Sequence, residues 1–491
     1  MSMANYSAIA DHDPMSASTE SLRGRRRGRG KHDAGHHGNA SWISSVINLA
    51  NTILGAGLLA MPSALSKMGI FLGIFVIAWA GFTSGFGLYL QTRCARYVDR
   101  GHASFAALSQ LTYPNASILF DAAIAVKCFG VAVSYLIIIG DLMPGVVVGF
   151  APGAKDVAFL VDRQFWITAF MLIVIPLSFL RRLDSLKYTS IIALFSIAYL
   201  VILVVAHYIK GDTLAQRGPV RVFEWAGPIN ALAAFPVIVF AYTCHQNMFS
   251  ILNEISDNSH FRTTTVILAS IGGGCALYIL TGITGYLSYG DNITGNIVSM
   301  YPTAAPATIG RFAIVVLVMF SYPLQIHPCR ASIAACASWR PRRSPPRSPS
   351  PSLLPPSTPK AQEMSDLRFA LVTTALIVAS FLTAMTVSSL SLVLAYVGST
   401  GSTTISFILP GLFYYKIADP QSAAHQRLVK DEDDAEDFGL GVEGGATREG
   451  VEGRERRRGL LRAAALGLAL YGVVVMVTCL AINIGFGGGG H

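Results

Sequence analysis

The sequence carries little charge for its length. Asp, Glu, Lys and Arg make up 13% of its 491 residues, whereas a soluble domain has about 25%. Hydrophobic residues account for 52%, and apolar runs of roughly twenty residues, long enough to cross a bilayer, recur along the whole chain. The scarcity of charge therefore excludes an ordinary soluble domain and predicts an all-α membrane protein with many spans.

Motifs for catalysis and for metal binding are also missing. The seven cysteines form no CxxC pair and have no spacing typical of Cys/His metal ligands. The chain contains no HExxH, no GxSxG and no paired carboxylates inside an apolar run, which argues against a membrane protease or acyltransferase. It also lacks a pore-loop signature or charge ring typical of a channel. We therefore expect no enzyme activity, no cofactor and no metal site.

Apolar windows along the chain predict eleven membrane spans. These cover residues 42–65, 70–92, 119–147, 165–181, 188–208, 229–250, 264–289, 309–329, 368–388, 390–414 and 460–484. The first eight spans lie within 41–330, the next two within 367–415 and the last within 459–485. The other segments are expected to be a disordered cytoplasmic tail at 1–40, a cytoplasmic Pro/Ser/Arg-rich linker at 331–366, a charged cytoplasmic loop at 416–458 and a lumenal tail at 486–491.

The net charge of +9 does not indicate a nucleic-acid partner. Most of it lies in loops and tails, where basic residues set the topology of a membrane protein. The cluster Arg23–Arg29 lies close to the first span, so we expect a cytoplasmic N-terminus. With this topology Asn292, which heads the triplet Asn292-Ile293-Thr294, is predicted to be a lumenal glycosylation acceptor.

The first span is not the uniform helix of a simple anchor. Its centre reads Asn51-Thr52-Ile53-Leu54-Gly55-Ala56-Gly57, and two glycines around one small residue weaken a helix at mid-membrane. Non-helical backbone at that depth is tolerated only inside the protein or beside a water-filled cavity. The pattern therefore predicts a broken helix of the type that builds substrate sites in transporters. Close helix packing is an alternative role for both glycines.

The sixth span carries a second irregular stretch. Pro236 removes a backbone donor, and the run Tyr242–Asn247 is polar at a depth where unpaired groups are costly. Two broken helices that face each other supply the groups that an amino-acid zwitterion needs. Half-helix N-termini would hold the carboxylate, and free carbonyls would hold the ammonium or a coupling cation.

Three titratable residues in or near the spans each have more than one interpretation. His245 is either a proton relay or a satisfied inter-helix hydrogen-bonding group. Lys127 takes part in transport, snorkels, or pairs with Asp121 or Asp141. Glu254 is either a gate or an ordinary interfacial carboxylate.

Three stretches resemble the amino acid/auxin permease family. They are Asn48–Pro62 in the first span, Phe240–Asn247 in the sixth and Tyr322–Arg330 in the eighth. The combination is similar to fungal vacuolar amino-acid transporters, which are related to sodium-coupled neutral amino-acid transporters. The linker at 339–359 departs from the family pattern. Three explanations stay open, namely a lineage insertion, a regulatory loop or an error in the gene prediction.

The resemblance implies a leucine-transporter-like fold of the APC superfamily, with a five-plus-five inverted repeat of helices and one additional helix. It also implies a substrate site between the first and sixth helices and a cation site between the first and eighth. The implied substrate-binding residues are Thr52, Gly55, Ala56, Gly57, Ala241, Tyr242, Thr243 and Cys244. The implied coupling-cation residues are Asn51, Leu54 through its main chain, and Ser321.

Together these observations predict a secondary active transporter that exports amino acids from the vacuole to the cytosol by proton symport and alternating access. Na⁺ is the alternative coupling ion, and the plasma membrane is the alternative location. One other class stays open, namely an amino-acid sensor that signals through its cytoplasmic tail and loops. The expected partners are an amino-acid substrate and membrane lipid.

Overall fold

The structure is a computed structural model that describes residues 38–180, 189–339, 365–422, 426 and 448–486. Within these ranges the chain is almost entirely helical and has no β-strand, apart from an isolated parallel bridge between Ala40 and Ile255. The predicted all-α fold is confirmed. The tail at 1–37 and most of the expected linker and charged loop lie outside the described residues.

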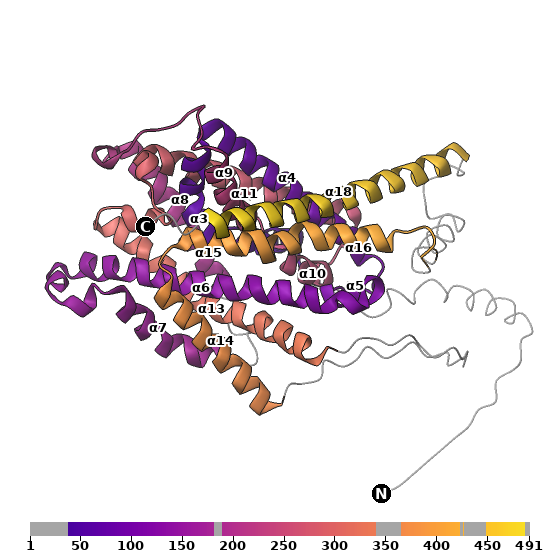
Figure 1. The fold of residues 1–491 in the computed structure, drawn as a ribbon, viewed down its shortest axis with the longest axis horizontal. Helices are drawn as coiled ribbons and strands as arrows, with labels where there is room; N and C mark the ends of the chain where they lie inside the picture. Colours follow the sequence, from indigo (N-terminus) through magenta and orange to yellow (C-terminus); the bar gives the residue numbers. More distant parts are fainter. Residues whose placement is uncertain (1–37, 181–188, 340–364, 423–425, 427–447, 487–491) are drawn as a thin grey trace, which may run out of the picture.

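The α-helices form one elongated bundle (Figure 1). They are α2 (Trp42–Ile53), α3 (Ala56–Met68), α4 (Ile70–Ala95), α5 (Phe105–Thr112), α6 (Ser117–Phe150), α7 (Arg163–Ser178), α8 (Thr189–Lys210), α9 (Pro228–Ala241), α10 (His245–Glu254), α11 (His260–Tyr289), α12 (Ile297–Met300), α13 (Ala305–Ser338), α14 (Asp366–Thr386), α15 (Leu390–Val397), α16 (Leu409–Ile417) and α18 (Arg448–Phe486).

Length and hydropathy identify the helices that can cross a membrane. In the described part of the chain, nine helical stretches qualify on their own, and the bent pair α2 and α3 makes a tenth span. Helix α7 is apolar but has only 16 residues. The eleven predicted spans each overlap one of these elements. Side chains on the outer faces support a lipid environment, because Leu172, Phe195 and Ile209 are 78%, 74% and 77% exposed.

Two helices extend beyond their predicted ends. Helix α13 continues to Ser338, into the segment expected to be linker, and α18 begins at Arg448, inside the expected charged loop. An apolar window detects only the part of a helix that lipid surrounds, whereas Arg and Glu are good helix formers and continue the helix into water. Figure 1 shows the start of α18 projecting beyond the rest of the bundle.

The tenth span is not the continuous α-helix that we expected over 390–414. Between α15 and α16 the backbone widens into two π-helical stretches, η8 (Gly398–Ser402) and η9 (Thr404–Ile408). The widening occurs where other helices approach closely. A Cβ at Gly398 would lie 1.9 Å from the Pro236 oxygen of α9, and one at Gly401 would lie 2.7 Å from the Ala123 oxygen of α6. Short π segments are frequent at functional sites.

Candidate functional site

The first span is broken where its sequence predicts. Helix α2 ends at Ile53, α3 begins at Ala56, and the two helices bend by 54°. Gly55 is the N-cap of α3 and provides no side-chain cap. The amides of Ala56 and Gly57, the first two of α3, therefore have neither an intrahelical acceptor nor a side-chain cap, which leaves them available to a ligand.

The two glycines at this break have different surroundings. A Cβ at Gly55 would meet no atom within 4 Å, so this residue borders open space. A Cβ at Gly57 would lie 2.6 Å from the Ala241 Cβ and 2.8 Å from its Cα. Gly57 therefore permits close contact between α3 and α9, as the packing interpretation proposed, whereas Gly55 does not serve packing.

The sixth span is also broken, over a shorter stretch than the polar run Tyr242–Asn247. Helix α9 ends at Ala241 and α10 begins at His245, which leaves three residues outside the helices. Pro236 lies inside α9 and does not end it. The hydroxyl of Thr243 donates a 2.9 Å hydrogen bond to the Val239 oxygen and so satisfies one carbonyl near the break.

A cavity of about 660 Å³ lies beside both breaks. Among the predicted site residues, its lining includes Asn51, Thr52, Leu54, Gly55, Ala56, Gly57, Ala241, Thr243 and Ser321. Helices α6 and α8 contribute apolar side chains, among them Val131, Ile197 and Leu200. The structure thus brings residues from the first, sixth and eighth spans to a single cavity. Their assignment to substrate or cation stays a prediction.

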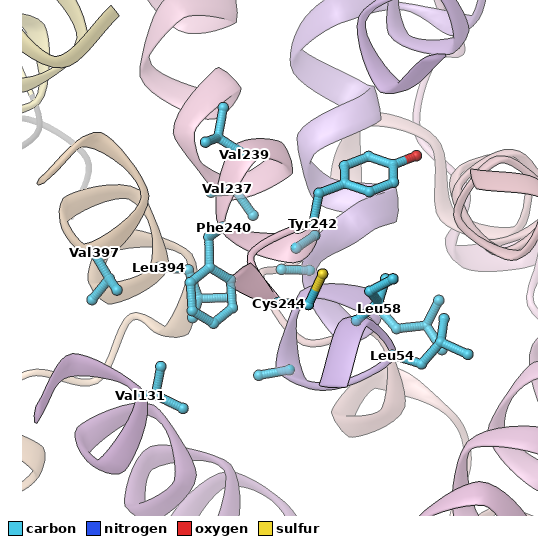
Figure 2. Close-up of a cluster of buried hydrophobic side chains, with 14 of the residues drawn as sticks. Leu54, Leu58, Val131, Val237, Val239, Phe240, Tyr242, Cys244, Leu394 and Val397 are labelled. Atoms are coloured by element: carbon cyan, nitrogen blue, oxygen red, sulfur yellow. The ribbon is translucent and has the colours of Figure 1, made fainter. Parts of the chain in front are cut away.

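Three predicted site residues do not line this cavity. Tyr242, Cys244 and His245 are 0% exposed. Figure 2 shows Phe240 turned toward Val131, while Tyr242 points in another direction. A Cβ at Gly81 of α4 would lie 3.2 Å from the Tyr242 hydroxyl oxygen. The side chains of consecutive residues point in several directions. When all residues of a family motif are assigned to the site together, some of their side chains therefore point away from the cavity.

His245 belongs to the same buried face. Its Nε2 donates a 3.2 Å hydrogen bond to the Ser84 carbonyl of α4. Its Nδ1 has no hydrogen-bond partner among the residues that the structure describes. This geometry matches an inter-helix contact. The proton-relay role of His245 stays a prediction.

Several polar groups face the cavity. The oxygens Asn51 Oδ1 and Gln246 Oε1 are buried and accept no hydrogen bond from the described residues. Asn247 Nδ2 donates a 2.6 Å bond to Thr52 Oγ1 and thereby joins α10 to α2. Ser321 Oγ donates to the Leu317 oxygen at 2.8 Å and keeps its lone pairs free. Such oxygens can bind an ammonium group or a hard cation.

The charged residues of the described lining are Lys127 and Glu254. Lys127 is 4% exposed and forms no ion pair within the described ranges. Neither predicted pairing occurs, because Asp141 binds Arg163 at 3.1 Å and no bond joins Lys127 to Asp121. Lys127 therefore places an unpaired amino group beside the breaks. Glu254, at the end of α10, lies next to the N-terminal segment, since its carbonyl accepts from the Ala40 amide at 2.9 Å.

Sequence reasoning missed part of this lining. Gln246 and Asn247 lie within the polar run of the sixth span, so the polarity of this run could have identified them as lining residues. Tyr135 and Gln325 also line the cavity, but a single polar side chain in a long apolar run does not reveal which face of its helix meets a cavity. Asn292 is exposed, and its Nδ2 donates to the Gln216 oxygen at 3.0 Å. Its glycosylation stays a prediction.

Two helices that are each broken in the middle and packed together beside a cavity with polar groups form the arrangement typical of broken-helix transporters. Comparison with known sequences gives the family. The chain belongs to the family described as "Transmembrane amino acid transporter protein", whose profile matches residues 38–432. It is therefore a membrane transporter and not an enzyme.

Named relatives agree with this assignment. The chain is 43% identical over 454 residues to "Vacuolar amino acid transporter 5" of Schizosaccharomyces pombe, which covers 91% of this chain and 96% of the relative. It is 43% identical over 411 residues to "Vacuolar amino acid transporter 6" of Saccharomyces cerevisiae, covering 77% and 90%. More distant is "Sodium-coupled neutral amino acid transporter 7" of Rattus norvegicus, at 28% identity over 314 residues, covering 60% and 65%.

A solved structure supports the architecture. The fold matches the crystal structure of MhsT in complex with L-phenylalanine with a TM-score of 0.53, over 91% of this chain and 100% of that chain. The sequences are only 12% identical, so this likeness concerns the fold alone. The predicted leucine-transporter-like fold is confirmed.

Proposed function

We propose that this protein exports amino acids from the vacuole to the cytosol by alternating access, driven by proton symport. The observation that carries the proposal is the pair of breaks, at 54–55 and 242–244, beside one polar cavity. The vacuolar location and the amino-acid substrate rest on the names of the relatives from the two yeasts.

The breaks supply the groups that an amino acid needs. The uncapped N-terminus of α3, at Ala56 and Gly57, suits the substrate carboxylate through amide donors and the helix dipole. Main-chain carbonyls of the unwound stretches and the unpaired Gln246 oxygen suit the ammonium. The apolar side chains of α6 and α8, including Val131, suit the substrate side chain.

The cavity extends toward the side that holds the N-terminus. Its lining continues from the breaks along α10 to Ser250 and Glu254, and Glu254 neighbours Ala40. With a cytoplasmic N-terminus, this cavity opens to the cytosol. Rocking of one group of helices against the other around the breaks would open the opposite side.

Proton coupling is energetically sufficient. One pH unit is worth about 1.4 kcal/mol per proton, and 100 mV adds about 2.3 kcal/mol per charge. An acidic, positive lumen therefore drives export with one proton per substrate. Na⁺ is the alternative, and the candidate ligands for it are Asn51 Oδ1, the Leu54 main chain and Ser321 Oγ, all at the cavity.

The test uses vacuoles isolated from cells that contain or lack the protein and loaded with labelled amino acids. We expect faster export with the protein, and a protonophore should remove the difference. If export persists in the presence of the protonophore and requires a Na⁺ gradient, the coupling ion is Na⁺ and not the proton. Equal export from both preparations, with the protein present in the vacuolar membrane, would overturn the proposal.

A further inference from the structure

One side chain joins the two broken helices at their ends. The hydroxyl oxygen of Tyr278, on α11, lies 2.5 Å from the Ile53 carbonyl oxygen and 2.7 Å from the Ala241 carbonyl oxygen. Ile53 is the last residue of α2, and Ala241 is the last residue of α9. The final carbonyls of both half-helices therefore converge on a single atom.

Converging carbonyls at helix C-termini attract cations. Each C-terminus carries a partial negative charge from the helix dipole, and freed carbonyls of broken helices coordinate Na⁺ or H⁺ in transporters. A phenol has one proton, so it donates to only one of the two carbonyls at a time. The hydroxyl nevertheless occupies the point between both oxygens, where a cation would otherwise lie.

The position of this hydroxyl is fixed by packing. Tyr278 is 0% exposed and does not line the cavity. One turn earlier, a Cβ at Gly274 would lie 2.9 Å from Ile53 Cγ2, so the glycine lets α11 approach α2. The ring of Tyr242 packs edge-on against the Tyr278 ring, with centroids 5.2 Å apart. These contacts hold the hydroxyl behind the breaks, away from the cavity.

We propose that Tyr278 is a positioning residue whose hydroxyl replaces a metal cation at the junction of α2 and α9. It holds the two half-helix ends together, so this junction needs no ion for the substrate site to form. The inference rests on the proposed function for its role in transport. It concerns a different place from the candidate coupling site at Asn51 and Ser321, because Tyr278 lies outside the cavity that those residues line.

The variant Tyr278→Phe removes the hydroxyl and keeps the ring. It leaves two buried carbonyls without their donor, which we expect to lower transport by roughly tenfold or more in Na⁺-free choline buffer. Added Na⁺ or Li⁺ should occupy the vacated point. We therefore expect both ions to raise the melting temperature of the purified variant more than that of the unaltered protein, and to restore part of its transport.

Tyr286→Phe is the matched control. Tyr286 is also a fully buried tyrosine of α11, but its hydroxyl donates to Asp291 Oδ1 at 3.0 Å and touches no half-helix end. Its loss should reduce stability without creating a response to Na⁺. If Tyr278→Phe yields too little purified protein, its response is measured in membranes, as the fraction that stays soluble in detergent after heating with or without Na⁺, with the same expected gain from Na⁺.

Two results would overturn the inference. One is full transport by Tyr278→Phe in choline buffer, which would show that the hydroxyl is dispensable. The other is a loss of transport and stability that neither Na⁺ nor Li⁺ reverses, which would leave an ordinary structural hydrogen bond. The melting measurement requires no substrate, so it separates failure of this inference from failure of the proposed transport function.

Discussion

At the residue scale, the two glycines of the first break differ in what they tolerate. Gly57→Ala places a methyl group against the Cα and Cβ of Ala241, and overpacking of this kind costs about 1–3 kcal/mol. We expect lower transport and a lower melting temperature. Gly55→Ala places its methyl group in open space and should leave the melting temperature unchanged. Equal melting temperatures for the two variants would contradict the packing role of Gly57.

Lys127 gives a second prediction at this scale. Its amino group is the basic group of the described lining, and a hydrogen bond to a charged substrate carboxylate is worth about 1.5–3 kcal/mol. We expect Lys127→Met to weaken competition by acidic amino acids by roughly tenfold, the equivalent of about 1.4 kcal/mol. Lys127→Arg, which keeps a basic donor, should lose less. An unchanged inhibition profile across acidic, neutral and basic amino acids would exclude a role in specificity.

The first break was predictable because its residues violate a strong local rule. Asn, Thr and two glycines do not belong in the middle of a lipid-facing helix, and the composition of Asn51–Gly57 reveals this without structural information. The direction of each side chain was not predictable, as Tyr242 and Cys244 show. The role of Tyr278 also leaves no trace in the sequence, because one tyrosine in an apolar run resembles any other core residue.

At the element scale, the tenth span shows what periodicity does not reveal. The stretch Gly398–Ile408 is rich in Gly, Ser and Thr but lies between apolar residues, so the whole segment is predicted as one span. It is helical, but its backbone widens where α6 and α9 lie against it. Contact between elements determines this change, and a window along one segment contains no information about its neighbours. Helix number and order were therefore predictable, whereas local helix type was not.

This close contact leads to a prediction. Gly398→Ala brings a methyl group to within 1.9 Å of the Pro236 oxygen unless α15 moves away from α9. We expect a loss of stability of about 1–3 kcal/mol and impaired transport. Gly467→Ala in α18 is the control, because no atom lies within 4 Å of its added Cβ and Ala is the better helix former by about 1 kcal/mol. Equal melting temperatures for both variants would refute the tight contact.

At the scale of the whole molecule, the arrangement of helices explains why the cavity has one open direction. Lining residues continue from the breaks to Glu254 on α10, beside the point where the N-terminal segment meets that helix. In α12, which lies between α11 and α13 along the chain, Ile297 and Val298 are fully buried. Under the proposed mechanism, this cavity corresponds to a state that is open toward the N-terminal side.

This asymmetry can be measured with one added cysteine at a time in a background in which Cys128, Cys275 and Cys336 are replaced by Ser, since Cys128 lines the cavity and the other two are partly exposed. Ser250 is an exposed lining residue of α10, and Thr294 is exposed in the loop after α11. We expect a membrane-impermeant thiol reagent to label Ser250→Cys from the cytosolic side and Thr294→Cys only from the lumen. Substrate should slow labelling of Ser250→Cys, because occupied transporters spend more time closed to the cytosol, and should leave Thr294→Cys unaffected. Labelling of both positions from the same side of the membrane would contradict the topology. If no amino acid changes the labelling rate of Ser250→Cys, the cavity is not the transport route.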